Sequence, residues 1–270
     1  MNTIVVQSFR ANDVPSWIVE CMATVRKWAQ DNGFCYRFMG DGFLQLAPDW
    51  YREKAAGYLT VVTDLARLEL AKQCLLEGFE RCIWIDADVV IFLPSLLNID
   101  PHLPFGFCRE VWLGRDGLGR LICDERVNNS VCVFRQDSIE WLENYIANCN
   151  SIVKQLPILR DNLEVGTRYL TNLHRLQRLP LIDHVGLISR LLMEAILRQD
   201  TGTLRLFMER TGGPLYAANL CNYFRTRASD PRVIDDKYRA VFRTLVDRGD
   251  EILNSIWYAG DALRGARNPS

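Results

Sequence analysis

The sequence has 270 residues, of which 49% are hydrophobic and 24% charged, and its formal net charge is −1. This composition is ordinary for a globular protein and argues against a disordered or fibrous chain. The 32 basic and 33 acidic residues nearly cancel, and no apolar run reaches the roughly 20 residues of a membrane helix. We therefore expect no nucleic-acid partner and no transmembrane segment.

The first half of the chain alternates strand and helix patterns. In chain order these are a strand at 3–7, a helix at 16–31, a strand at 34–39, a helix at 60–77 and a strand at 82–85. The last of these, Cys82-Ile83-Trp84-Ile85, is an unbroken apolar run typical of a central strand covered on both faces. The alternation predicts an α/β fold around a parallel sheet.

The second half is predicted to be mainly helical. Strand patterns occur at 105–108 and 131–134, separated by a Gly-rich stretch, and helices are expected at about 138–148, 185–198, 214–225 and 232–247. The chain has no linker-like segment and no internal repeat. We therefore expect one domain over residues 1–270, with a helical C-terminal half.

The nine cysteines are scattered, and no Cys-x-x-Cys pair occurs. With only three histidines in the chain, the ligand spacing of a zinc site is also missing. Most of the cysteines lie in apolar runs, where Cys behaves as a small hydrophobic residue. This usage predicts free thiols in a reducing compartment and a cytoplasmic location.

Two carboxylates, Asp86 and Asp88, follow the apolar strand at 82–85. Residues at i and i+2 of an extended chain share a face, so both carboxylates can contact the same ligand. Two neighbouring negative charges beside a core strand need compensation, and Mn²⁺ or Mg²⁺ with oxygen ligands would supply it. The alternative is a polar strand end whose aspartates cap the next turn.

The helix that precedes this strand carries Asp64 and Arg67 near its start. Residues three apart lie on one helical face, so the two form either a surface ion pair or part of the same crevice as the aspartates. In the crevice, Arg67 would reach a phosphate oxygen and Asp64 would accept hydrogen bonds from sugar hydroxyls.

The string Thr63-Asp64-Leu65-Ala66-Arg67, followed by an apolar strand ending in Asp86-Ala87-Asp88, resembles the core of the GT-A-fold sugar transferases with an Asp-x-Asp motif. The resemblance is to the group that contains yeast α-mannosyltransferases and the glucosylating clostridial toxins. It implies a Rossmann-like mixed sheet with flanking helices. One departure is the connection at 76–81, which replaces a tight Gly-Gly turn of the family.

The resemblance also implies roles for other residues. Asn129, in Asn128-Asn129-Ser130, would face the donor sugar, although Asn-Asn-Ser is also ordinary turn chemistry. Gln7 and Ser8, at the end of the first strand, would bind the nucleobase, and Trp17 would stack on it. In the closing Asn254-Ser255-Ile256-Trp257, Asn254 and Ser255 would complete the metal shell. Trp257 would donate its indole N–H to the diphosphate or, alternatively, pack in the core.

These features predict a glycosyltransferase of the hexosyltransferase class that uses Mn²⁺ or Mg²⁺. The resemblance implies a UDP-sugar donor, retention of configuration, and a saccharide, lipid-linked, peptide or protein acceptor. Asp86, Asp88, Arg67 and Asn129 are the expected catalytic residues. Two alternatives remain: a haloacid-dehalogenase-type phosphatase, and a module that binds a nucleotide sugar or a partner without turnover. The phosphatase motif normally lies near the N-terminus and continues with Gly-Thr, whereas here Val89 and Val90 follow Asp88.

Overall fold

The structure is a computed structural model that describes residues 1–227 and 230–259. Its main sheet has six strands in the order β2-β1-β3-β6-β5-β7. The strands are β1 (Thr3–Ser8), β2 (Cys35–Met39), β3 (Arg81–Ile85), β5 (Phe105–Arg115), β6 (Leu121–Arg135) and β7 (Leu181–Ile182). β1 is parallel to β2 and β3, β6 is antiparallel to β3 and β5, and β7 is parallel to β5. The predicted α/β class with a mixed sheet is confirmed.

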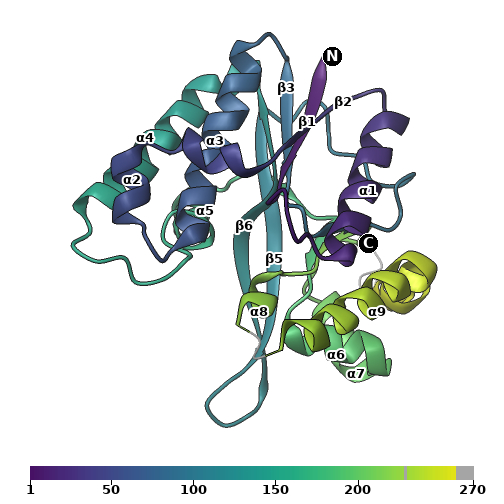
Figure 1. Cartoon of the computed structure of the whole chain (residues 1–270). Helices are drawn as coiled ribbons and strands as arrows, with labels where there is room; N and C mark the ends of the chain where they lie inside the picture. Colours follow the sequence, from purple (N-terminus) through teal and green to yellow (C-terminus); the bar gives the residue numbers. More distant parts are fainter. Residues whose placement is uncertain (228–229, 260–270) are drawn as a thin grey trace, which may run out of the picture.

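Helices cover both faces of this sheet (Figure 1). They are α1 (Ser16–Asp31), α2 (Asp49–Lys54), α3 (Leu59–Leu76), α4 (Ile139–Gln155), α5 (Thr167–Leu176), α6 (Arg190–Arg198), α7 (Thr201–Met208), α8 (Tyr223–Thr226) and α9 (Pro231–Gly249). Short helical turns lie at η1 (Asp41–Leu46), η2 (Gln136–Ser138) and η3 (Asp250–Asn254). Helices α2 to α5 lie on one side of the sheet and α1 on the other, while α6, α7 and α9 gather below (Figure 1).

The apolar run of β3 is explained by burial on both faces. Cys82 and Trp84 point into a core formed with α3, α4 and α5, whereas Ile83 and Ile85 point into a second core formed with α1. Burial of one apolar side chain stabilises the fold by about 1.5–3 kcal/mol. The packing on both faces therefore fixes the C-terminal end of β3, and Asp86 is the residue that follows it.

A second sheet has three short strands in the order β4-β9-β8, namely β4 (Val89–Ile91), β9 (Ala217–Asn219) and β8 (Val185–Leu187). Two predicted helices are therefore wrong in part. The segment at 185–198 begins with β8 and becomes helical only at α6, and the segment at 214–225 contains β9 before the short α8. In each case, pairing with strands far away in the sequence overrides the local pattern.

Strands β5 and β6 are much longer than predicted and form a hairpin that extends beyond the body of the molecule (Figure 1). Their pairing shifts between Phe107, which lies opposite Cys132, and Cys108, which lies opposite Asn128. β6 thus carries extra residues, including Asn129, that lack a partner in this ladder. Such bulges bend a strand and redirect its side chains, often beside a functional site.

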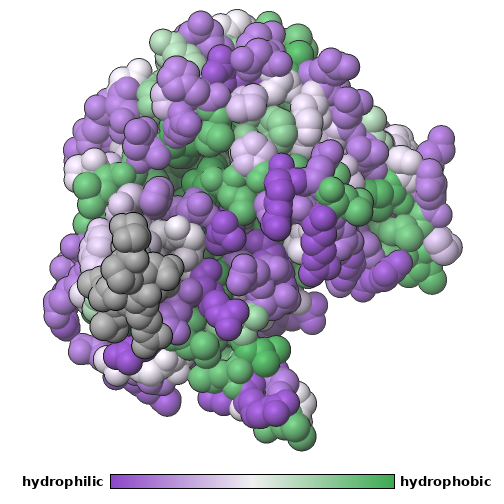
Figure 2. All heavy atoms as spheres, turned by 180° about the vertical axis from the view of Figure 1, so that it is seen from behind, coloured by the Kyte–Doolittle hydropathy of each residue, from purple (hydrophilic) through white to green (hydrophobic). Residues whose placement is uncertain are grey.

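The face opposite to that of Figure 1 is largely hydrophilic, with apolar side chains in a central hollow (Figure 2). At the tip of the β5–β6 hairpin, the side chain of Leu118 is 79% exposed. In the described part of the chain, no helix has the length and apolar character needed to cross a membrane.

Candidate active site

Asp86 follows the C-terminal end of β3 and is held by groups on both sides. Its backbone N–H donates to the carbonyl of Ser130 over 2.7 Å. Its carboxylate oxygen Oδ1 accepts the indole N–H of Trp84 over 2.7 Å and forms an ion pair with Nη1 of Arg67 at 3.2 Å. The side chain retains 25% exposure. Asp86 is therefore fixed in orientation yet accessible.

Asp64, Arg67 and Asn129 lie together behind Asp86, as the sequence predicts. Nη2 of Arg67 lies 3.2 Å from Oδ1 of Asp64, and the side-chain amide of Asn129 donates to the same oxygen over 3.0 Å. Nη1 of Arg67 also donates to the Asn129 carbonyl over 2.6 Å. The surface ion pair is excluded, because the Asp64 and Arg67 side chains are 2% and 5% exposed.

The nitrogens of Arg67 are all engaged by the protein. Besides the contacts of Nη1 and Nη2, Nε donates to the carbonyl of Thr63 over 3.3 Å, and the guanidinium lies 5.1 Å from the ring centroid of Trp84. Arg67 therefore acts on Asp64 and Asp86 in this structure. The predicted contacts of Arg67 with phosphate, and of Asp64 and Asn129 with the donor sugar, stay predictions.

Asp88 is held by hydrogen bonds from the end of β9 and from the turn that follows it. Its carboxylate accepts the side-chain amide of Asn219 at Oδ1 over 3.1 Å and the backbone N–H of Asn222 at Oδ2 over 2.7 Å. Its carbonyl accepts the N–H of Leu220 over 2.9 Å. Cys221 adopts a left-handed conformation with φ of 58°, which is uncommon for a residue with a Cβ. The turn at 219–222 thus wraps around Asp88.

Burial makes this group of carboxylates costly to ionise. It raises the pKa of Asp88 to about 7, with a further contribution from the charge of Asp86. Burial also raises the pKa of Asp64 to about 6, although Arg67 and the Asn129 hydrogen bond act in the opposite direction. The pKa of Asp86 is raised by burial against the influence of Arg67. Arg67 forms ion pairs with Asp64 and Asp86, whereas the carboxylate of Asp88 is bound only by amide N–H groups of Asn219 and Asn222 in the described contacts. The three carboxylates thus outnumber the one guanidinium, and the site favours an additional cation.

Gln7 is fully buried under this site. Its amide donates to the carbonyl of Asp86 over 3.2 Å, and its oxygen accepts the hydroxyl of Tyr36 over 3.0 Å. Gln7 thus supports the chain at Asp86, next to the half-buried Ser8, and their contact with a nucleobase stays a prediction. Trp17 is 0% exposed, stacks on Tyr238 and donates to Asp235, so its predicted stacking on a base is not supported.

The residues of the predicted closing motif lie in or directly after η3. Asn254 is fully buried, and its amide binds both the N–H and the carbonyl of Leu215. The hydroxyl of Ser255 donates to the carbonyl of Glu251. Trp257 is half-buried and packs against the core around α6, α7 and α9. The contacts given for Asn254 and Ser255 are thus structural, and metal ligation by them stays a prediction, as does a diphosphate contact of Trp257.

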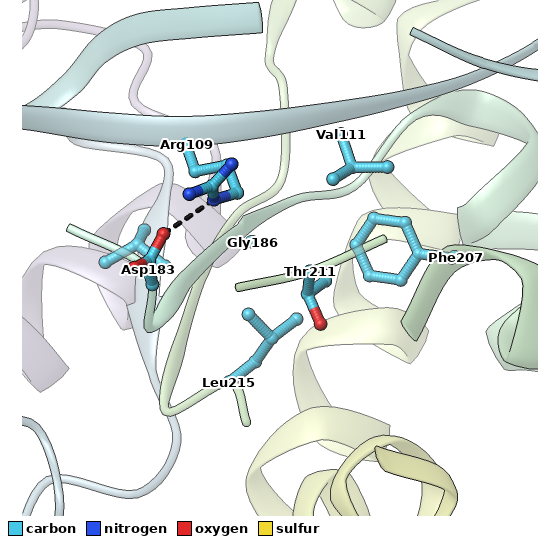
Figure 3. Close-up of a pocket in the computed structure, with 8 residues that line it drawn as sticks. Arg109, Val111, Asp183, Gly186, Phe207, Thr211 and Leu215 are labelled. Atoms are coloured by element: carbon cyan, nitrogen blue, oxygen red, sulfur yellow. Dashed lines mark hydrogen bonds and ion pairs between the residues drawn. The ribbon is translucent and has the colours of Figure 1, made fainter. Parts of the chain in front are cut away.

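A cavity beside the hairpin is lined by Arg109, Asp183, Thr211 and neighbouring side chains (Figure 3). Nε of Arg109 donates to Oδ1 of Asp183 over 2.6 Å. At about 10 Å³ the cavity has room for one water molecule and none for a sugar. A Cβ on Gly212 would lie 2.5 Å from Asp183, which explains a glycine at that position of the Thr-Gly-Gly-Pro segment.

Sequence reasoning missed several residues of the site, namely Trp84, Gly166, Asn219, Cys221 and Asn222. Trp84 reads as part of an apolar run, and nothing in the sequence marks its indole N–H as the partner of Asp86. Gly166 lies against Asp64, since a Cβ there would be 2.4 Å from the carboxylate oxygen Oδ2. The residues around β9 reach Asp88 only through the pairing of β9 with β4.

Asp86 and Asp88 are the candidate protein ligands of a divalent cation at this site. Among the described residues, no group of three or more His, Cys, Asp and Glu side chains is arranged to hold a metal ion. Asp86 and Asp88 supply two carboxylates, and the buried side-chain oxygen Oδ1 of Asn222 has no hydrogen-bond partner. Two carboxylates with an amide oxygen and water suit Mg²⁺ or Mn²⁺, so the residues present fit such an ion.

No protein-family model matches the chain, and no curated protein matches its sequence. Among solved structures, the chain is similar to a glycosyltransferase involved in the glycosylation of the major capsid of PBCV-1. The TM-score is 0.51 at 11% identity, covering 88% of this chain and 99% of that one. It also aligns with apo mouse xyloside xylosyltransferase 1, with a TM-score of 0.43 at 10% identity, covering 82% and 98% of the two chains. The first likeness confirms the predicted fold class, a mixed sheet of the GT-A type with flanking helices.

Proposed function

We propose that the chain is a metal-dependent, retaining glycosyltransferase that transfers a sugar from a nucleoside diphosphate sugar, with UDP as the nucleotide. The observation that carries the proposal is the pairing of Arg67 with Asp64 and Asp86 at the carboxyl end of β3, with Asp88 two residues further on. Ligands of open α/β sheets bind at this end of the strands. The resemblance of the motifs and the likeness in fold both support the proposal. The acceptor is a saccharide, a lipid-linked saccharide, a peptide or a protein.

Asp86 and Asp88 would hold Mn²⁺ or Mg²⁺, because their side chains are the half-buried ones of the group, whereas Asp64 and Arg67 are buried. When bound, the ion supplies Lewis-acid stabilisation of the departing diphosphate. Departure of the nucleotide leaves negative charge at the site, and a fixed positive environment lowers the barrier.

Arg67 keeps Asp64 and Asp86 ionised and oriented through its two short ion pairs. Asn129 holds the same Asp64 oxygen, and Trp84 holds one oxygen of Asp86. The network fixes the direction in which Asp86 presents its carboxylate, and such preorganisation avoids rearrangement during the reaction. Asp64, Arg67 and Asn129 thus position Asp86 from below.

A thermal-shift experiment on the full chain tests this function with UDP, GDP and CDP, each with and without Mn²⁺. A ligand that binds only the folded state raises the melting temperature. We expect a shift with UDP that requires Mn²⁺, together with release of UDP from a UDP-sugar in a turnover assay. If none of the three nucleotides raises the melting temperature, with or without Mn²⁺, the proposal is refuted.

These assays, together with a phosphatase assay, separate the two alternatives. A metal-dependent UDP shift without UDP release from any UDP-sugar would favour a binding module. Hydrolysis of p-nitrophenyl phosphate that is lost in Asp86→Asn, with no nucleotide shift, would favour the phosphatase.

A further inference from the structure

The side chain of Asn222 has an unexplained polar atom next to the acidic site. Its oxygen Oδ1 is buried and has no hydrogen-bond partner among the described residues. Buried polar atoms in folded proteins nearly always have a partner, so an orphaned oxygen calls for an explanation such as an ion at that place.

The backbone of Asn222 fixes where this oxygen can lie. Its N–H donates to Oδ2 of Asp88 over 2.7 Å. Within one asparagine, four covalent bonds separate the backbone nitrogen from Oδ1, so the two atoms are within about 5 Å of each other. The orphaned oxygen therefore lies within about 8 Å of the carboxylate of Asp88.

The turn that presents Asn222 is rigidly held. The N–H of Cys221 donates to Oδ1 of Asn219 over 2.6 Å, and the hydroxyl of Tyr238 donates to the carbonyl of Cys221 over 2.6 Å. Both bonds involve backbone groups of Cys221, the residue with the left-handed conformation. Uncommon backbone conformations that the surroundings enforce are concentrated at functional sites.

The amide oxygen of Asn254, which the resemblance assigns to this role, is already hydrogen-bonded within the protein. Asn254 Oδ1 accepts the N–H of Leu215 over 2.8 Å, and its amide donates to Leu215 and to Asp250. Ser255 is exposed and bonded within its own helical turn. The amide oxygen of Asn222 thus has no partner among the described residues, whereas that of Asn254 already accepts a hydrogen bond.

We propose that the side-chain oxygen of Asn222 is a protein ligand, beside Asp86 and Asp88, of a divalent cation such as Mn²⁺. This inference rests on the proposed function, because it assigns a further ligand to the same metal. An amide oxygen is a normal ligand for hard cations such as these. The cation would satisfy the orphaned oxygen and offset the excess negative charge of the carboxylates in one step.

The test is a Mn²⁺ titration of the full chain without nucleotide, followed by the electron paramagnetic resonance signal of free Mn²⁺. We expect Asn222→Ala to raise the Kd for Mn²⁺ at least tenfold. Asn222→Asp, which keeps an oxygen at the same place, should bind at least as tightly as the wild type. Asn144→Ala, a change at an exposed asparagine on α4, is the matched control and should leave the Kd unchanged. Ser255→Ala is the variant that tests the other predicted ligand.

The fold should survive the key substitution, because alanine retains the N–H that binds Asp88. Asn222→Gln, which shifts the amide oxygen by one methylene, provides a second variant and should also weaken binding. A Kd for both variants within twofold of that of the wild type would overturn the ligand assignment, as would a loss of binding in Ser255→Ala alone.

The outcome for the wild type separates this inference from the proposed function. If the wild type binds Mn²⁺ and UDP and Asn222→Ala does so equally well, only the role of Asn222 fails. If the wild type binds neither Mn²⁺ nor UDP, the proposed function fails with it.

Discussion

The indole N–H of Trp84 donates a hydrogen bond to Oδ1 of Asp86 over 2.7 Å. Alternate residues of a strand share a face, so the last large side chain of β3 lies directly beside the first acidic one. The Trp84 ring is in turn stacked on Phe43, with ring centroids 5.1 Å apart, and lies against the guanidinium of Arg67. A core residue thus fixes the orientation of the more exposed carboxylate.

Trp84→Phe removes the donor and keeps an aromatic ring against Phe43 and Arg67. A hydrogen bond to a charged group contributes about 1.5–3 kcal/mol, so we expect kcat/KM for UDP release to fall roughly 10- to 100-fold. Trp50→Phe, at an exposed tryptophan on α2, is the matched control. Equal activity of the two variants would show that the Trp84 hydrogen bond does not position Asp86.

Asp88→Asn is expected to abolish Mn²⁺-dependent activity while the chain remains folded. The substitution removes one of the three carboxylates of the site, and the side-chain oxygen that remains can still accept the amide of Asn219. Because burial makes the Asp88 charge unfavourable without metal, the variant should melt at or above the temperature of the metal-free wild type at pH 8. Activity assays and melting curves check both parts, and full activity of the variant would refute the assignment of Asp88.

The raised pKa values of Asp64, about 6, and Asp88, about 7, predict how stability changes with pH. In the unfolded chain an aspartate titrates near 3.9, so the metal-free folded state binds these protons more tightly. The contribution of these two groups to stability is therefore most favourable below pH of about 4 and declines as pH rises through 6 to 7. If Mn²⁺ binds as proposed, it binds the ionised form and should reverse this decline.

Melting curves of the wild type and Asp88→Asn between pH 5 and pH 8 measure this effect. We expect the stability advantage of Asp88→Asn without metal to grow with pH, and the stabilisation of the wild type by Mn²⁺ to grow over the same range. A difference between the two proteins that does not change with pH would contradict a raised pKa of Asp88.

The elements with strong local signals were predictable from the sequence. Helix α1 has a clear apolar period and ends at Asp31, two residues before Gly33, and strand β3 is an unbroken apolar run that ends at Ile85. The predicted bounds of both elements agree with the structure within one residue. The helices predicted at 185–198 and 214–225 were wrong in part, because these segments begin with or contain β8 and β9. Both are three-residue strands whose pairing partners are remote in the sequence. A strand this short has no period of its own to read.

The same division holds at the site. Asp64, Arg67, Asp86 and Asn129 lie together, as the resemblance of the motifs implies, because α3, β3 and β6 are adjacent in the fold. The support of Asp88 by Asn219 and Asn222 depends on the pairing of β9 with β4 and on the left-handed conformation of Cys221. A cysteine carries no sequence signal for that conformation, so this part of the site could be found only in the structure.

Gly166→Ala is a test of the buried end of the network. An added Cβ would lie 2.4 Å from Oδ2 of Asp64, closer than any real contact, and would force that carboxylate away from Arg67 and Asn129. Overpacking of this kind costs about 1–3 kcal/mol, so we expect a lower free energy of unfolding and reduced activity. Gly42→Ala is the matched control, since a Cβ there has nothing within 4 Å. If Gly166→Ala loses stability but keeps the specific activity of the control, the position of Asp64 does not matter for the reaction, and its role is confined to the fold.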